Sequence, residues 1–217
     1  VNVGAGGLTG TGTLDLGSGN IVLSSIGTAT VDPSTISGGG QLTKSGPGTV
    51  YLDTAMAGDA VVQEGTLAGS GAIGGTLTVQ GSAAYAPGGS PAQVNLGSFD
   101  LDPNALLAVE INGSDAGIDF DQLIVSSTGS VTVDGILDVS LGFAPELFST
   151  YMIVDNQSSG AVTGVFSDIT GDGPWEVTYT GGTGNDVVLT FVPEPTTGLL
   201  LLLGTSSLLL RRRAAKN

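Results

Sequence analysis

The chain has 217 residues, enough to bury a core, and it contains neither cysteine nor histidine. Without them it has no disulfide, no thiol nucleophile, no Ser/His triad and no thiolate or imidazole metal ligand, which excludes most hydrolase and oxidoreductase chemistry. The formal net charge is −15, with 20 acidic and five basic residues. Such a surface repels phosphate backbones, so we expect no nucleic-acid partner.

The basic residues are concentrated at the carboxyl end. Only Lys44 precedes the cluster Arg211–Arg213 and Lys216, so the first 192 residues are strongly acidic. The chain opens at Val1 and shows no basic, apolar and small-residue pattern of a signal peptide, so we expect a processed or truncated amino end.

Residues 1–192 consist of short β-branched runs broken by glycine, as in "TVYLD", "GTLTVQG" and "ILDVSLG". Alternation with a period of two, with Gly, Asn, Asp or Ser at the breaks, predicts strands joined by tight turns. The only stretch of helix formers, Ala105 to Ala108, is too short for a helix. We therefore predict an all-β fold.

A glycine pattern indicates how the strands are arranged. The pattern L-x-G-x-G-apolar occurs at residues 8–14 and again at residues 67–73, and a stretched copy lies at 42–50. The displacement of 59 residues is close to three coils of roughly 20 residues, which is typical of a β-solenoid. Stacking buries the apolar face that a single coil would leave exposed, so we predict a β-solenoid.

The composition changes at "YAPGGSPAQ", where prolines and glycines interrupt the strands. We expect a glycine-rich β-solenoid at residues 1–84, a Pro/Gly linker at 85–93 and a β-rich part at 94–192. This last part is expected either to continue the solenoid with wider coils or to form a sandwich-like cap. A separate tail follows at 193–217.

The segment "GGQLTKSGPGTVYL" (residues 39–52), followed by "VVQEGTL" (residues 61–67), resembles the autotransporter-associated (passenger-associated) β-strand repeat of bacterial exported proteins. The later segments "GSGAIGG", "APGGSP", "FDQLIV" and "GGTGNDVVLTF" occur in the same order in proteins with that repeat. The link "DTAMAGDA" departs from the family's aromatic, glycine-rich link. The resemblance implies a right-handed parallel β-helix outside the cell.

The carboxyl end is similar to the PEP-CTERM sorting signal, which has a motif, an apolar stretch and a basic cluster in that order. The resemblance implies recognition by an exosortase-type transpeptidase. The motif is Pro193, Glu194 and Pro195, and the basic cluster is Arg211, Arg212 and Arg213.

The physical properties of the tail agree with this interpretation. A helix over residues 198–210 would be about 20 Å long, shorter than a stable bilayer span, so we expect a short hydrophobic helix that anchors only marginally. The arginines would stop it on the cytoplasmic side of the inner membrane, which places the acidic domain outside. The alternative is an ordinary tail anchor.

We expect no cofactor, but two loops resemble calcium-binding motifs and make calcium the alternative. "GGTGNDVV" matches one nonapeptide of the calcium-binding β-rolls, but that motif needs tandem copies and occurs here once. "DITGDGPWE" has the oxygen spacing of an EF-hand loop, but it lacks the final glutamate and the flanking helices. We expect both to be turns, and we keep Asp168, Asp172 and Asp186 as candidate calcium ligands.

Asp115, Asp119 and Asp121 form an acidic cluster in which alternation would place Asp119 and Asp121 on one face of a strand. Paired carboxylates catalyse glycoside hydrolysis. Because the domain has few aromatic residues and no His or Arg to tune a pKa, we expect no enzyme. We expect an exported structural protein of the cell surface or biofilm matrix, and the alternative is an adhesin module that binds calcium or extracellular polysaccharide.

Overall fold

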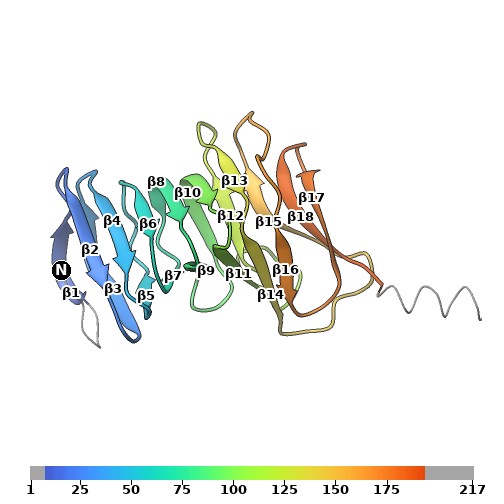
Figure 1. Ribbon diagram of the computed structural model, residues 1–217, viewed down its shortest axis with the longest axis horizontal. Helices are drawn as coiled ribbons and strands as arrows, with labels where there is room; N and C mark the ends of the chain where they lie inside the picture. The colour runs from blue at the N-terminus through green and yellow to red at the C-terminus, as the bar shows by residue number, and fades with distance from the viewer. Residues whose placement is uncertain (1–7, 194–217) are drawn as a thin grey trace, which may run out of the picture.

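The computed structural model describes residues 8–193 and shows two long sheets that face each other (Figure 1). We call the eight-stranded one sheet 1 and the ten-stranded one sheet 2. Sheet 1 has the order β1 (Leu8–Asp15), β3 (Ala29–Ser37), β5 (Thr49–Leu52), β7 (Thr66–Gly69), β9 (Ala84–Pro87), β11 (Leu106–Ile111), β14 (Ile136–Leu141), β16 (Asp168–Gly171). Sheet 2 has the order β17 (Trp175–Gly181), β18 (Asp186–Phe191), β15 (Thr150–Asn156), β12 (Gln122–Val125), β10 (Gln93–Leu101), β8 (Ile73–Val79), β6 (Ala60–Val62), β4 (Gln41–Ser45), β2 (Asn20–Ser24), and β13 (Val131–Val133) pairs with β10.

The chain winds as a parallel solenoid, because successive strands from β1 to β12 alternate between the two sheets. All strand pairs are parallel except those of β18 with β15 and with β17. Residues 8–193 contain no helix, so this part of the chain has no helix that could cross a bilayer. The predicted all-β fold with parallel, solenoid-like sheets is confirmed. The predicted short hydrophobic helix falls in residues 194–217, outside the described part.

The coil first shortens and then lengthens along the chain, since Leu8 pairs with Val31 in the first coil. Thr49 pairs with Thr66 in sheet 1, whereas Leu107 pairs with Leu137 further along the same sheet. Parallel pairing thus continues through β14 and β16 in wider coils. The antiparallel hairpin β17–β18, which we call the cap, then extends sheet 2 beyond β15 (Figure 1). Residues 85–87 of the expected linker lie in β9, where Tyr85 is buried in the core.

The glycine pattern gave the right coil length but the wrong correspondence between residues. Three coil steps lead from Leu8 through Val31 and Leu52 to β7, as the displacement of about three coils predicts. However, Leu14 lies in sheet 1, whereas its expected equivalent Ile73 begins β8 in sheet 2. The copies are therefore not structural repeats of one another.

Inward-facing side chains form continuous columns between the sheets. In sheet 1 the register stacks Ala29, Val50, Leu67, Tyr85, Leu107 and Leu137. In sheet 2 it stacks Leu42, Ala60, Leu77, Phe99 and Val131. All of these side chains are buried, as the period of two requires.

The wider coils near the cap are filled by aromatic rings. Tyr151 makes edge-to-face contacts with Phe120, Phe143 and Trp175, at centroid distances of 5.3, 6.4 and 5.8 Å, and Trp175 contacts Phe191. Large rings fill the extra space between sheets that longer coils create, and edge-to-face pairs add about 0.5–1.5 kcal/mol each.

The corners of the narrow coils are made of stacked backbone. A Cβ at Gly48 would overlap the Gly27 carbonyl oxygen, and one at Gly65, where φ is +69°, would overlap the Gly48 carbonyl oxygen. Glycine is therefore required where successive corners approach each other this closely.

Lys44 is the only basic residue of the described part, and it points into the core with no exposed surface. Its Nζ donates to the carbonyl oxygens of Ser45, Gly46 and Glu64 at 3.0, 2.6 and 2.9 Å. Burial lowers the pKa of Lys44, and the charge of Glu64 opposes this shift. All three donors of the ammonium are thus used to join two coils at a corner.

Candidate functional site

Several of the acidic side chains bind backbone amides. A carboxylate oxygen accepts a backbone N–H at Asp15, Asp53, Asp59, Asp119, Asp121, Asp168, Asp172 and Asp186. These aspartates lie at or near the ends of strands. Much of the acidic composition is therefore explained by capping of the corners.

Asp186 begins β18 and has no exposed surface. Its Oδ1 accepts the Asn156 N–H at 2.8 Å, and its Oδ2 accepts the Thr183 N–H at 2.6 Å and the Thr183 hydroxyl at 3.0 Å. The carboxylate therefore holds the "GGTGND" turn against the end of β15.

The other two candidate calcium ligands lie at the ends of β16. Asp168 accepts the N–H of Ile169, and Asp172 accepts the N–H of Leu141 at 3.0 Å, so the loop is bound to the neighbouring coil. The structure does not bring these residues together with Asp186. Within residues 8–193 no group of three or more carboxylates is placed to hold a metal ion.

Asp119 and Asp121 lie in the turn before β12 and not on one face of a strand. Asp119 accepts the N–H groups of Ser114 and Asp115 within its own turn. Asp121 is buried, and it accepts the N–H groups of Ala92 and Glu110, each at 2.8 Å. The two carboxylates therefore cap different backbone segments.

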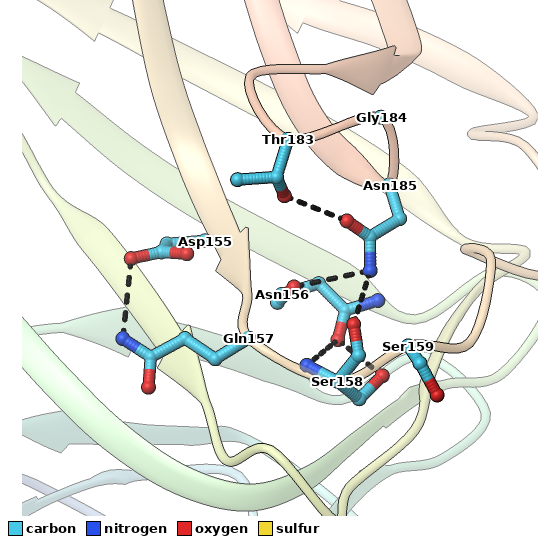
Figure 2. A pocket seen from close by; sticks show the side chains of 8 residues that line it. All are labelled: Asp155, Asn156, Gln157, Ser158, Ser159, Thr183, Gly184 and Asn185. Carbon is cyan, nitrogen blue, oxygen red and sulfur yellow. Dashed lines mark hydrogen bonds between the residues drawn. The ribbon is translucent and has the colours of Figure 1, made fainter.

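A polar cavity of about 620 Å³ lies between the end of β15 and the turn before β18 (Figure 2). Asn185 points across it, and its Nδ2 donates to the carbonyl oxygens of Asn156, Ser158 and Gly160. The buried Asn156 side chain is also engaged, because it donates to the Gly160 carbonyl and accepts from Ser158. The side-chain amides of Asn156 and Asn185 therefore hold the loop after β15 against the turn before β18.

The remaining polar groups of this cavity offer little for a ligand. Asp155 accepts a hydrogen bond from Gln157 at 3.5 Å, and Ser159 is exposed (Figure 2). Sequence analysis identified the turn before β18, but it did not identify Asn156 and Asn185 as the residues whose hydrogen bonds hold this turn to the loop after β15. The signal was the Asn-Asp pair at the end of the glycine-rich turn, whose side chains accept and donate to backbone groups.

A second cavity, of about 230 Å³, lies on the outer face of sheet 1. Its lining includes Tyr51, three alanines, several hydroxyl residues, and Glu110, Asp121 and Asp138. Sequence analysis missed this groove, because its residues come from five strands whose register the sequence does not give. We call it the sheet 1 groove.

The residues of the expected sorting signal lie almost wholly outside the described part. Pro193 is half-buried after β18, and Glu194, Pro195 and Arg211, Arg212 and Arg213 fall beyond it. A comparison with protein-family models finds no match, and neither does a search of the curated proteins.

We expect calcium to stabilise the protein no more than magnesium does, because Asp172 and Asp186 already bind backbone amides. Melting temperatures with millimolar Ca²⁺ or Mg²⁺ test this. A rise specific to Ca²⁺ that disappears in Asp172→Ala would overturn the prediction.

Asp121 predicts a pH dependence. Burial raises the pKa of Asp121 to about 7, although its two backbone hydrogen bonds oppose the rise. Since the unfolded carboxyl titrates near 3.9, the folded state binds the proton more tightly between about pH 4 and 7. The contribution of Asp121 to the free energy of unfolding is therefore largest at acidic pH, and it is lost as the pH rises through 7.

We expect the melting temperature to fall by a few degrees between pH 5 and pH 8, since 1 kcal/mol corresponds to about 2–4 °C in a domain of this size. Calorimetry across this range measures the slope. Asp121→Asn should flatten it, although Asp100, whose pKa burial also raises, contributes in the same direction. An unchanged slope in Asp121→Asn would show that Asp121 is not responsible.

Proposed function

We propose that the chain is an exported, non-enzymatic structural protein of the cell surface or extracellular matrix, sorted through its carboxyl-terminal signal. The observation that supports this most is the long parallel solenoid, in which several aspartates cap the backbone and no group of three carboxylates is placed to hold a metal within residues 8–193. Eight strands spaced by about 4.8 Å make sheet 1 roughly 35 Å long, so the fold suits a stiff spacer. The strong negative charge favours solubility outside the cell.

The proposal includes the handedness and the tail. We infer that the coil is right-handed, because parallel strands joined within one sheet are right-handed in nearly all proteins. The motif Pro193, Glu194 and Pro195 is the recognition site for an exosortase-type enzyme, and the apolar stretch at 198–210 holds the chain in the inner membrane until processing. The cluster Arg211, Arg212 and Arg213 stops the segment on the cytoplasmic side.

Replacing Pro193, Glu194 and Pro195 together with alanine tests the sorting proposal in a host that has an exosortase-type enzyme. We expect the wild-type chain at the cell surface and the variant in the membrane fraction, because the variant lacks the recognition motif. Glu176→Gln, an exposed change on β17, is the matched control. Equal surface display of the triple variant and the wild type would contradict the proposal.

A second candidate function is that of an adhesin module that binds extracellular polysaccharide. The observation in its favour is the sheet 1 groove, which combines an aromatic ring, hydroxyl groups and carboxylates on the outer surface.

A further inference from the structure

The bottom of the sheet 1 groove is formed by alanine side chains on neighbouring strands, which are too small to fill the space above the sheet. Ala68 stands in register with Tyr51 on one side and Ala86 on the other, and Ala108 stands in register with Asp138. Strand alternation places these residues on the outer face of sheet 1, where Ala68 is covered by its neighbours and the others are half-buried. The phenol of Tyr51 and the carboxylate of Asp138 therefore lie at opposite ends of an alanine floor.

One wall of the groove is held in place before any ligand binds. Gly88 exchanges two backbone hydrogen bonds with Gly69, at 2.9 and 3.1 Å, and has a φ of +75°. Further along the same loop, the Ala92 N–H donates to Asp121. A preformed wall costs little ordering entropy on binding.

The charge of the groove is uniformly negative. Glu110 is exposed, Asp138 is half-buried, and the buried carboxyl of Asp121 also lines the cavity. The only basic residue within residues 8–193, Lys44, is buried and bound to three carbonyls, so it cannot neutralise the groove. The hydroxyls of Thr49, Thr66 and Ser140 complete the polar lining.

We propose that the sheet 1 groove binds an oligosaccharide that carries primary ammonium groups, that is, an amino-sugar polymer. An ammonium is attracted by the carboxylates and by the face of the Tyr51 ring, and the same ring and hydroxyls contact the sugar. Uronic or sulfated sugars are repelled. The shallow alanine floor fits the flat face of a sugar ring.

This inference deepens the proposed function, because it names the matrix component that the surface protein would bind. The two can fail separately. Binding is measured on the purified full chain in mild detergent, and it does not depend on whether the tail is recognised or cleaved in the cell.

Calorimetric titration with a glucosamine hexamer tests the inference, with the N-acetylated hexamer and hexalysine as comparisons. We expect the glucosamine hexamer to bind at least about tenfold more tightly than either comparison, with an affinity that falls as salt rises. Equally tight binding of hexalysine would show general attraction to an acidic surface and would overturn the proposal. Equal binding of the acetylated hexamer would remove the role of the ammonium and would also overturn it.

Variants separate the shape of the groove from its charge. Ala86→Leu fills the floor from the outer face without changing the charge, and we expect it to weaken binding about tenfold or more with a nearly unchanged melting temperature. Glu110→Gln should weaken binding severalfold, whereas Glu176→Gln, which removes the same charge on β17, should not. Wild-type affinity in Ala86→Leu would contradict a site in this groove.

Discussion

Asp186→Ala should lower the free energy of unfolding by about 2–4 kcal/mol, because it leaves the buried N–H of Asn156 and the partly buried N–H of Thr183 without an acceptor. The carboxylate that now accepts both N–H groups has no exposed surface. The loss of this contact also releases the turn that fastens the loop after β15. Urea denaturation measures the effect.

Asp155→Ala is the matched control for this prediction, since Asp155 lines the same cavity but its carboxylate accepts only a long hydrogen bond from Gln157. We expect the control to cost less than about 1 kcal/mol. Similar losses in the two variants would show that Asp186 does not fasten the cap.

Lys44→Met should lower the free energy of unfolding by about 2–4 kcal/mol. Methionine retains much of the side-chain volume but removes three hydrogen bonds from the carbonyl oxygens of Ser45, Gly46 and Glu64. Replacement of a buried charge by an apolar residue is sometimes neutral, because the charge was costly to desolvate. Here every donor of the ammonium is paired, so we expect the orphaned carbonyls to dominate.

Chemical denaturation of Lys44→Met measures this loss beside that of Glu64→Gln. The Glu64 side chain is exposed and supports Lys44 only by its charge, so its neutralisation should cost less than about 1 kcal/mol. Wild-type stability in Lys44→Met would mean that water satisfies these carbonyls.

The sequence predicts the strands well, because burial follows the period of two. Burial alternates in this way in β5 and β14. In "QLTKS" the side chains of Leu42 and Lys44 share the inward face and are buried, although Thr43 between them is buried too. The inward position of Lys44 was therefore visible in the pattern, although its three carbonyl partners were not. The coil length of roughly 20 residues was also visible, from the spacing of the glycine pattern.

The sequence does not give the register, because coil length changes from one turn to the next. Leu14 and Ile73 occupy the same place in the glycine pattern but lie in different sheets. For the same reason Ala68, Ala86 and Ala108 could not be recognised as one floor. Asp119 and Asp121 were expected on one face of a strand, but they lie in the turn before β12, which directs each carboxylate to a different set of amides.

Intact-mass measurement of the protein recovered from the native cell surface tests the proposed function most directly. If the tail is a sorting signal, the recovered chain should end near Pro195 and lack the apolar stretch and the cluster Arg211, Arg212 and Arg213. A chain that still ends at Asn217, in a strain with a working exosortase-type enzyme, would contradict processing and would reduce the tail to a plain membrane anchor.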